Sequence, residues 1–189
     1  MGGLRRRLRG LDQLVFERVA GTRSSLLDDV LPRLSVAAHY GRLWMGVAAL
    51  LALSGRRDAR RAAVSGMVSL GVASVTANIV AKELSQRARP HHGVVPVVRR
   101  LRRAPVTTSF PSGHSASAAA FATAAGLEMP VLAVPLGVVA AGVVVSRVAT
   151  GAHYPSDVVA GSAVGVTVAL LLRPRRPANS GRPRSGTAR

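Results

Sequence analysis

Three groups of polar and basic residues in this sequence could act together on a phosphate group. In chain order they are Lys82, Arg89 and Pro90; then Ser112, Gly113 and His114; then Ser146, Arg147, His153 and Asp157. Lys82 is the only lysine among 26 basic residues. A guanidinium pairs with two phosphate oxygens at once, and an ammonium acts as a compact point charge. The cations Lys82, Arg89 and Arg147 therefore predict a phosphate site.

The other polar residues have spacings that suit the same site. Ser112 and Gly113 precede an alanine-rich run, so we expect them at a helix N-terminus, where free backbone N–H groups and the helix dipole hold anions. His153 and Asp157 are four residues apart, so on a helix they share one face and the carboxylate can hold an imidazole nitrogen. Each part alone also has a plainer interpretation: a capping serine, a structural His–Asp pair, and a lysine at a helix C-terminus.

Taken together, the three groups resemble the tripartite sequence pattern of the type 2 phosphatidic acid phosphatase superfamily, which also includes vanadium haloperoxidases. The matching residues stand in the family's order, as Lys82-x6-Arg89-Pro90, Pro111-Ser112-Gly113-His114 and Ser146-Arg147-x5-His153-x3-Asp157. The resemblance covers residues 82–157 by motif and extends to about residue 172 by helical arrangement. His91 and His92 lie outside the pattern.

The resemblance implies a role for each matched residue. Lys82, Arg89 and Arg147 would bind the phosphate with Ser112 and the Gly113 backbone. His153 would attack phosphorus and form a phosphohistidine, with Asp157 fixing the imidazole tautomer. His114 would protonate the leaving group and then activate the hydrolytic water. No metal and no cofactor is expected, because the three cations supply the charge stabilisation.

Apolar segments indicate which elements hold these residues. A membrane-spanning helix needs about 20 mostly apolar residues, and five segments approach this length, at 36–55, 62–81, 113–128, 130–149 and 156–172. Tyr40 and Trp44 are expected at headgroup level. Because successive spans alternate in direction, the loops 83–112 and 148–155 fall on one membrane face. We therefore predict an all-α, integral-membrane helical bundle of about five transmembrane helices.

The two ends of the chain differ from this domain, which we expect to cover residues 36–172. Residues 1–35 place apolar side chains at helical spacing among charges, which predicts amphipathic helices in the membrane interface; a soluble hairpin packed on the bundle is the alternative. Residues 173–189 are rich in Pro, Arg, Gly and Ser and are expected to form a disordered basic tail.

Composition narrows the partners of the chain. Its net charge is +18 and only 3% of its residues are aromatic, so anionic lipids in a bilayer are favoured over single-stranded nucleic acid, which needs stacking platforms. No cysteine is present, which excludes disulfides and thiolate chemistry. The sequence does not define an oligomeric state.

The function expected from the resemblance is an integral-membrane lipid phosphate phosphatase. Two alternatives remain open: a lipid phosphotransferase on the same fold, and a non-catalytic lipid-binding membrane module. Candidate substrates are phosphatidic acid, phosphatidylglycerol phosphate, polyprenyl (di)phosphate and phosphoribosyl-decaprenyl-phosphate. The distribution of arginines leaves orientation open, while the resemblance favours a multi-pass protein of the cytoplasmic membrane with its site on the extracytoplasmic face.

Overall fold

The computed structural model describes residues 2–80, 85–101 and 108–173. Lys82 and the expected tail from residue 174 onward lie outside these ranges. The described part is all-α, with seven α-helices. In chain order they are α1 (Gly2–Gly21), α2 (Leu31–Ala37), α3 (Arg42–Leu53), α4 (Arg57–Val75), α6 (Gly113–Glu128), α7 (Ala133–Ala149) and α8 (Pro155–Leu171). Each of the five predicted apolar segments overlaps one of the helices α3, α4, α6, α7 and α8.

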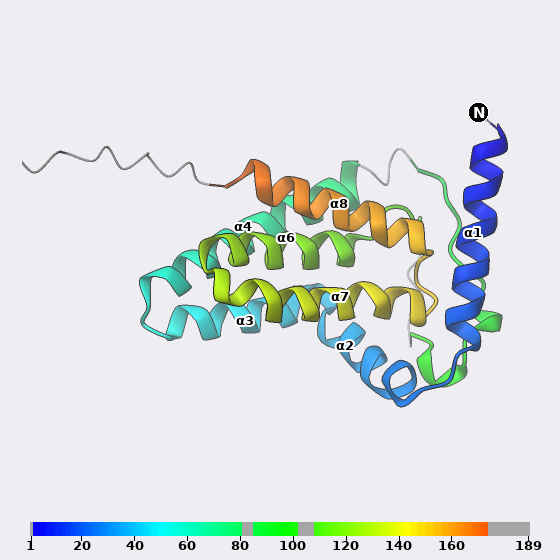
Figure 1. Ribbon diagram of the computed structural model, residues 1–189, viewed down its shortest axis with the longest axis horizontal. Helices are drawn as coiled ribbons and strands as arrows, with labels where there is room; N and C mark the ends of the chain where they lie inside the picture. Colours follow the sequence, from blue (N-terminus) through cyan, green and yellow to red (C-terminus); the bar gives the residue numbers. More distant parts are fainter. Residues whose placement is uncertain (1, 81–84, 102–107, 174–189) are drawn as a thin grey trace, which may run out of the picture.

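Helix α6 lies at the centre of the bundle and packs against α4, α7 and α8 (Figure 1). Its sequence is rich in alanine, and most of its residues are buried. Helix α8 presents Gly161 and Gly165 to α6, and a methyl group at Gly165 would lie 2.8 Å from the Ala120 nitrogen. Small residues let helix backbones approach closely where lipid supplies no hydrophobic driving force. The composition of α6 and α8 thus fixes their short separation.

Among the residues that the structure describes, two helical stretches are long and apolar enough to cross a membrane, Arg57–Ile79 and Pro130–Ala149. A third candidate is the pair Leu26–Ala37 and His39–Leu53, which is bent by 59°. The bend contains Tyr40 with φ 54° and Gly41 with φ 72°, a left-handed conformation that glycine adopts readily and tyrosine rarely. Helices α6 and α8, with 16 and 17 residues, are shorter than a full span. The chain is thus an all-α membrane protein with two or three candidate spans.

Trp44 does not lie at headgroup level, so that expectation is wrong. Its side chain is 1% exposed, and its ring lies 5.0 Å from the ring of Phe121 on α6. Gly66 on α4 leaves room for this pair, since a methyl group there would lie 2.8 Å from the Phe121 ring. Burying both rings in the core outweighs the interfacial preference of tryptophan. Tyr40, in contrast, is 80% exposed.

Helix α1 crosses the end of the bundle where α6 and α8 begin and α7 ends (Figure 1). Asp12, Phe16 and Ala20 are buried on one side of α1, and Phe16 packs edge-on against Tyr154, with 5.8 Å between ring centroids. Leu11 and Leu14 are exposed. The face of α1 that packs on the bundle therefore contains both polar and apolar side chains, whereas Leu11 and Leu14 point away from the protein.

Candidate active site

The described residues of all three predicted groups meet at the end of the bundle beneath α1. Arg89 lies in the segment before α6, Ser112 to His114 form the start of α6, Arg147 is in the last turn of α7, and Asp157 is in the first turn of α8. His153 lies in the short α7–α8 loop, where its backbone N–H donates to the Arg147 carbonyl oxygen at 3.1 Å. The alternation of helix direction brings these helix ends together, as expected from sequence.

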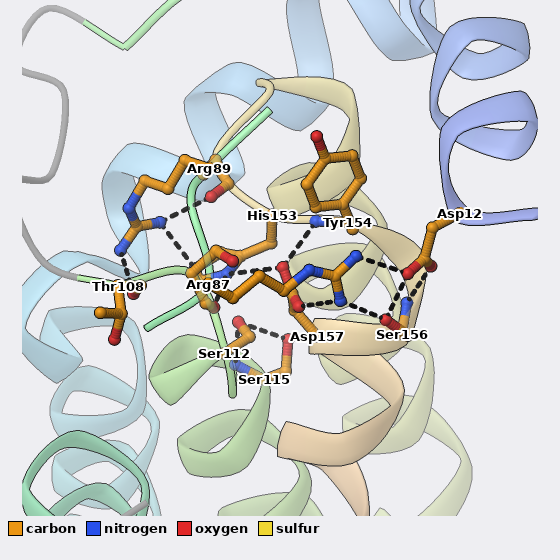
Figure 2. Close-up of polar contacts among 12 residues, drawn as sticks. Asp12, Arg87, Arg89, Thr108, Ser112, Ser115, His153, Tyr154, Ser156 and Asp157 are labelled. Carbon is orange, nitrogen blue, oxygen red and sulfur yellow. Dashed lines mark hydrogen bonds and ion pairs between the residues drawn. The ribbon is translucent and has the colours of Figure 1, made fainter. Parts of the chain in front are cut away.

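The neighbours of His153 define its tautomer. Its Nδ1 lies 2.7 Å from the Ser109 carbonyl oxygen, which can only accept, and its Nε2 lies 3.3 Å from Arg89 Nη1, which can only donate (Figure 2). Both contacts are hydrogen bonds only if the proton is on Nδ1 and the lone pair is on Nε2. Nε2 is thus the ring nitrogen that carries the lone pair of a neutral His153.

Burial keeps the His153 ring neutral. The side chain is 3% exposed, and burial, opposed by Asp157 and assisted by the charges of Arg147 and Arg89, lowers the pKa of His153 to about 4. A protonated imidazole has no lone pair to offer. Burial, together with the two nearby arginines, therefore keeps the ring in the neutral form that has a free lone pair.

Asp157 is fully buried and serves several partners (Figure 2). Its carboxylate accepts hydrogen bonds from Arg87 Nη1 at 2.8 Å and from the Tyr154 backbone N–H at 2.9 Å. Its Oδ2 lies 3.8 Å from His153 Nδ1, which is beyond hydrogen-bond distance. Ser109 rather than Asp157 therefore accepts the Nδ1 proton, and Asp157 acts on His153 through its charge.

Arg87 and Asp12 extend this network; the sequence places Arg87 near the first polar group without giving it a role, and does not point to Asp12. Arg87 Nη2 donates to Asp12 Oδ2 at 2.6 Å, and its guanidinium lies 4.5 Å from the Tyr154 ring centroid. Asp12 also accepts from the Ser156 N–H at 2.8 Å and from the Ser156 hydroxyl at 2.6 Å. Burial raises the pKa of Asp12, but the hydrogen bonds from Ser156 and Arg87 outweigh it and lower that pKa. Arg87 has a sequence signal, its place beside Arg89, whereas Asp12 has none.

Arg89 and Arg147, the two described arginines that the sequence predicts to bind phosphate, are oriented by backbone and side-chain oxygens. Arg89 Nη1 donates to the Ala152 carbonyl oxygen at 2.6 Å and its Nη2 to the Thr108 carbonyl oxygen at 3.1 Å; burial lowers the pKa of Arg89. Arg147 is 1% exposed and donates to the Ser35 hydroxyl of α2 at 2.6 Å. Within the described residues, Arg147 Nε has no hydrogen-bond partner, so this buried cation keeps a donor that an anion could accept.

The start of α6 combines a helix cap with a close backbone approach. The Ser112 hydroxyl accepts hydrogen bonds from the Ser115 N–H at 3.4 Å and the Ser115 hydroxyl at 3.0 Å, and the Ser112 N–H donates to the Asp157 carbonyl oxygen at 3.0 Å. Ser112 is therefore occupied by α6 and α8, and the structure supports its capping interpretation. A methyl group at Gly113 would lie 2.8 Å from Asn78 Cγ, so the π-helical turn Thr76–Val80 that follows α4 approaches the start of α6 closely.

His114 has a second histidine beside it. The ring centroids of His114 and His39 are 5.3 Å apart, and His39 belongs to the bend between α2 and α3. The sequence motifs do not include His39. Over the part of the chain that the structure describes, no three His, Cys, Asp or Glu side chains cluster in a way that could hold a metal ion.

Comparisons with known proteins agree with this geometry. The sequence matches the PAP2 superfamily over residues 62–180. It is 33% identical over 142 residues to the decaprenylphosphoryl-5-phosphoribose phosphatase of Mycobacterium tuberculosis, covering 71% of this chain and 74% of that protein. It is 33% identical over 137 residues to the undecaprenyl-diphosphatase of Sulfolobus acidocaldarius, covering 71% and 65%. The solved transmembrane PAP2-type phosphatidylglycerolphosphate phosphatase of Bacillus subtilis superposes with a TM-score of 0.68 at 20% identity, covering 88% and 84%.

Proposed function

The chain belongs to the PAP2 superfamily and is a membrane lipid phosphatase, and we propose that it removes a terminal phosphate from a polyprenyl lipid through a phosphohistidine at His153. The proposed substrate class is supported by two relatives, each of which aligns with about seven tenths of this chain. Their names specify decaprenylphosphoryl-5-phosphoribose and undecaprenyl diphosphate. Both substrates join phosphate to a long isoprenoid chain, which suits an enzyme embedded in the bilayer.

One observation carries the chemistry: the lone pair of His153 Nε2 faces a guanidinium at 3.3 Å while Nδ1 is held by the Ser109 carbonyl. A phosphoryl group in front of Nε2 would engage Arg89 with one oxygen and the unsatisfied Nε of Arg147 with another. Lys82 would add a third cation. Preorganised donors aimed at developing charge lower the barrier most, because they need no reorganisation.

The first half of the reaction transfers the phosphoryl group to the enzyme. Nε2 forms a bond to phosphorus as the bond from phosphorus to the leaving oxygen breaks, and His114 gives its proton to that oxygen. The ring of His153 then carries a positive charge with its proton still on Nδ1. Asp157, 3.8 Å from Nδ1, stabilises that charge.

The second half hydrolyses the intermediate. His114, now neutral, takes a proton from a water molecule whose oxygen attacks phosphorus. The phosphorus–Nε2 bond breaks, the electron pair returns to the imidazole, and inorganic phosphate leaves. Ser112 supports this site by capping α6 and through the hydrogen bond from its backbone N–H to the Asp157 carbonyl oxygen. Gly113 supports it because the lack of a side chain lets Asn78 come close.

The membrane arrangement is proposed from the same geometry. Helices α3, α4, α6, α7 and α8 would cross or enter the bilayer, and the short α6 and α8 would place the site near headgroup depth. Helix α1, with outward leucines, would lie in the interface over the site. The site would face the extracytoplasmic side. Because the chain contains no cysteine, Asp58→Cys and Leu101→Cys variants report the two faces: an impermeant maleimide should label only position 101 in intact cells.

The decisive experiment measures phosphate release by the detergent-purified protein. Wild type, His153→Ala and the matched control His91→Ala are compared on polyprenyl diphosphate, phosphatidic acid and phosphatidylglycerol phosphate, with EDTA present. We expect His153→Ala to lose activity by a factor of about 10⁴ or more, because the nucleophile is gone, and His91→Ala to keep it. Equal activity of wild type and His153→Ala on every lipid would refute the proposal. Incorporation of ¹⁸O from labelled water into the released phosphate distinguishes hydrolysis from phosphoryl transfer.

A further inference from the structure

An open pocket of about 670 Å³ adjoins the site on the side of His114. One wall of the pocket is α2 with the bend after it. The other wall is residues 98–101, which lie at the same end of the bundle (Figure 1). His39 lines this pocket, and its ring is 5.3 Å from the His114 ring. Ser35 on α2 accepts a hydrogen bond from Arg147. The pocket is therefore separated from His114 only by His39, and α2, which forms its wall, contacts Arg147 through Ser35.

The pocket is basic and its charge is not neutralised by the protein. Arg33, Arg42 and Arg100 line it, and none of its lining residues is an acid. Arg42 Nε reaches the His39 carbonyl oxygen at 3.4 Å, and Arg100 donates to backbone oxygens of Val95 and Gly93. Among the ion pairs of the described residues, none involves these three arginines.

Arg99 also lines the pocket but serves a different purpose. Its side chain is fully buried, with its Nε bonded to Asp28 at 2.7 Å and its two terminal nitrogens bonded to the carbonyl oxygens of Val19 and Thr22. Arg99 links the end of α1 to the pocket wall, and its charge is already paired with Asp28, so it is not a ligand-binding group.

Apolar side chains complete the lining, namely Pro32, Val36, Val98 and Leu101. Val36 is 60% exposed and Val98 is 56% exposed, so hydrophobic surface lies next to unpaired cations. A pocket of this kind suits an amphiphilic anion: a phosphate group that is attached directly to a hydrocarbon chain.

The direction of the reaction identifies which part of the substrate enters this pocket. His153 lies on one side of the scissile phosphorus, and His114 must lie beside the leaving oxygen, opposite to it, for an in-line displacement. The leaving group therefore extends past His114 toward His39. We propose that the pocket binds a second phosphate group in the leaving group, so that the enzyme selects polyprenyl lipids with two phosphates over lipids with one. This inference rests on the proposed function.

The charge on such a leaving group increases as the reaction proceeds. When the bond to the terminal phosphorus breaks, the bond electrons stay with the leaving oxygen of the lipid phosphate, which is more negative in the transition state because bond breaking runs ahead of proton transfer from His114. Arginines that contact this group stabilise the transition state more than the bound substrate, so their loss should reduce kcat as well as raise KM. A neutral leaving group, such as a diacylglycerol, would gain nothing from them.

The test uses two substrates that differ only in the second phosphate, farnesyl diphosphate and farnesyl monophosphate, in detergent. The double variant Arg33→Gln/Arg42→Gln is compared with the control Arg60→Gln/Arg61→Gln, which removes two arginines that line a different pocket. Each variant is compared with wild type on each substrate separately, because the two leaving groups differ in intrinsic reactivity. We expect the double variant to lose about tenfold or more in kcat/KM on the diphosphate, as lost charge-assisted contacts imply, and to keep its monophosphate activity. The control should keep both.

Other outcomes refute the inference in distinct ways. An equal loss on both substrates would mean that Arg33 and Arg42 only attract anionic lipid to the surface. Unchanged activity on both would mean that the second phosphate binds elsewhere. If wild type released no phosphate from either substrate or from any longer polyprenyl diphosphate, the proposed function would fail and this inference with it. The melting temperature of each variant, measured in the same detergent, confirms that it is folded.

Discussion

The close approach of α8 to α6 can be tested at Gly161. This residue lies one turn after Asp157 and faces the start of α6, where an added methyl group would overlap the Ser112 carbonyl oxygen and lie 3.1 Å from its carbonyl carbon. The obstacle is backbone, so it cannot rotate away. Gly161→Ala must therefore push the start of α6 and the first turn of α8 apart.

The size of the effect follows from this geometry. Relieving the overlap needs a separation of about 1 Å, and misplacement of that size in a reacting group can reduce the rate by about 100-fold. Overpacking of this kind also costs about 1–3 kcal/mol of stability. The hydrogen bond from the Ser112 N–H to the Asp157 carbonyl oxygen, 3.0 Å long, crosses this contact, so both residues would move relative to His153.

The assay compares Gly161→Ala with Gly71→Ala. Gly71 is also helical, but an added methyl group there meets nothing within 4 Å, so the substitution should be neutral or should stabilise α4 by up to about 1 kcal/mol. Phosphate release and the thermal midpoint in detergent are measured for both. Wild-type kcat/KM and an unchanged midpoint for Gly161→Ala would refute the close packing of α6 on α8.

Three further predictions concern the site and its supports. The pKa of His153, lowered to about 4, should appear as a midpoint near pH 4 in a histidine NMR titration. Arg89→Gln should raise this midpoint, because one repelling cation is gone. Since the folded ring stays neutral while the unfolded one takes up a proton, the unfolding free energy should fall as pH drops from about 6.5 toward 4. Asp12→Ala should destabilise the protein by about 1–3 kcal/mol, since the half-buried Ser156 and Arg87 Nη2 donors lose this acceptor, and the thermal midpoint in detergent should recover in part with Asp12→Asn. The pKa of Asp12 is lowered, so its stabilisation is present above pH 3.8 and is lost as pH falls further. Gly113→Ala should reduce phosphate release because its methyl group meets the Asn78 side chain, and adding Asn78→Ala should restore part of it.

The sequence anticipated the helices because each one depends on a local pattern. Apolar runs of 16 or more residues mark α4, α6, α7 and α8, and the alanine content of α6 indicates a helix with close neighbours on every side. The same local reasoning was wrong for Trp44. Its position near the end of an apolar segment suggested the interface, but the space left by Gly66 allows it to pack on Phe121, a fact of helix pairing that residues 36–55 alone do not contain.

The support of the site was not predictable from motifs. Asp12 and Ser156 are 144 residues apart in the chain, and only the crossing of α1 over the bundle brings them together. The holder of the His153 tautomer is likewise a backbone carbonyl, that of Ser109, and any residue type supplies a carbonyl oxygen. Side-chain identity therefore gave no signal for either interaction.

The sequence by itself determined the chemistry of this protein: the residue types at positions 82–157, in their order and spacing, and the helices that carry them. Tertiary structure decided how those residues are used. The packing of the helix ends buries His153 near two arginines and so keeps it neutral. Helix α1 completes the network around Asp157, and the bend between α2 and α3 lines a basic pocket next to His114. The physical reason is that spacing along a chain governs local structure, whereas burial and electrostatic environment depend on which distant surfaces come into contact.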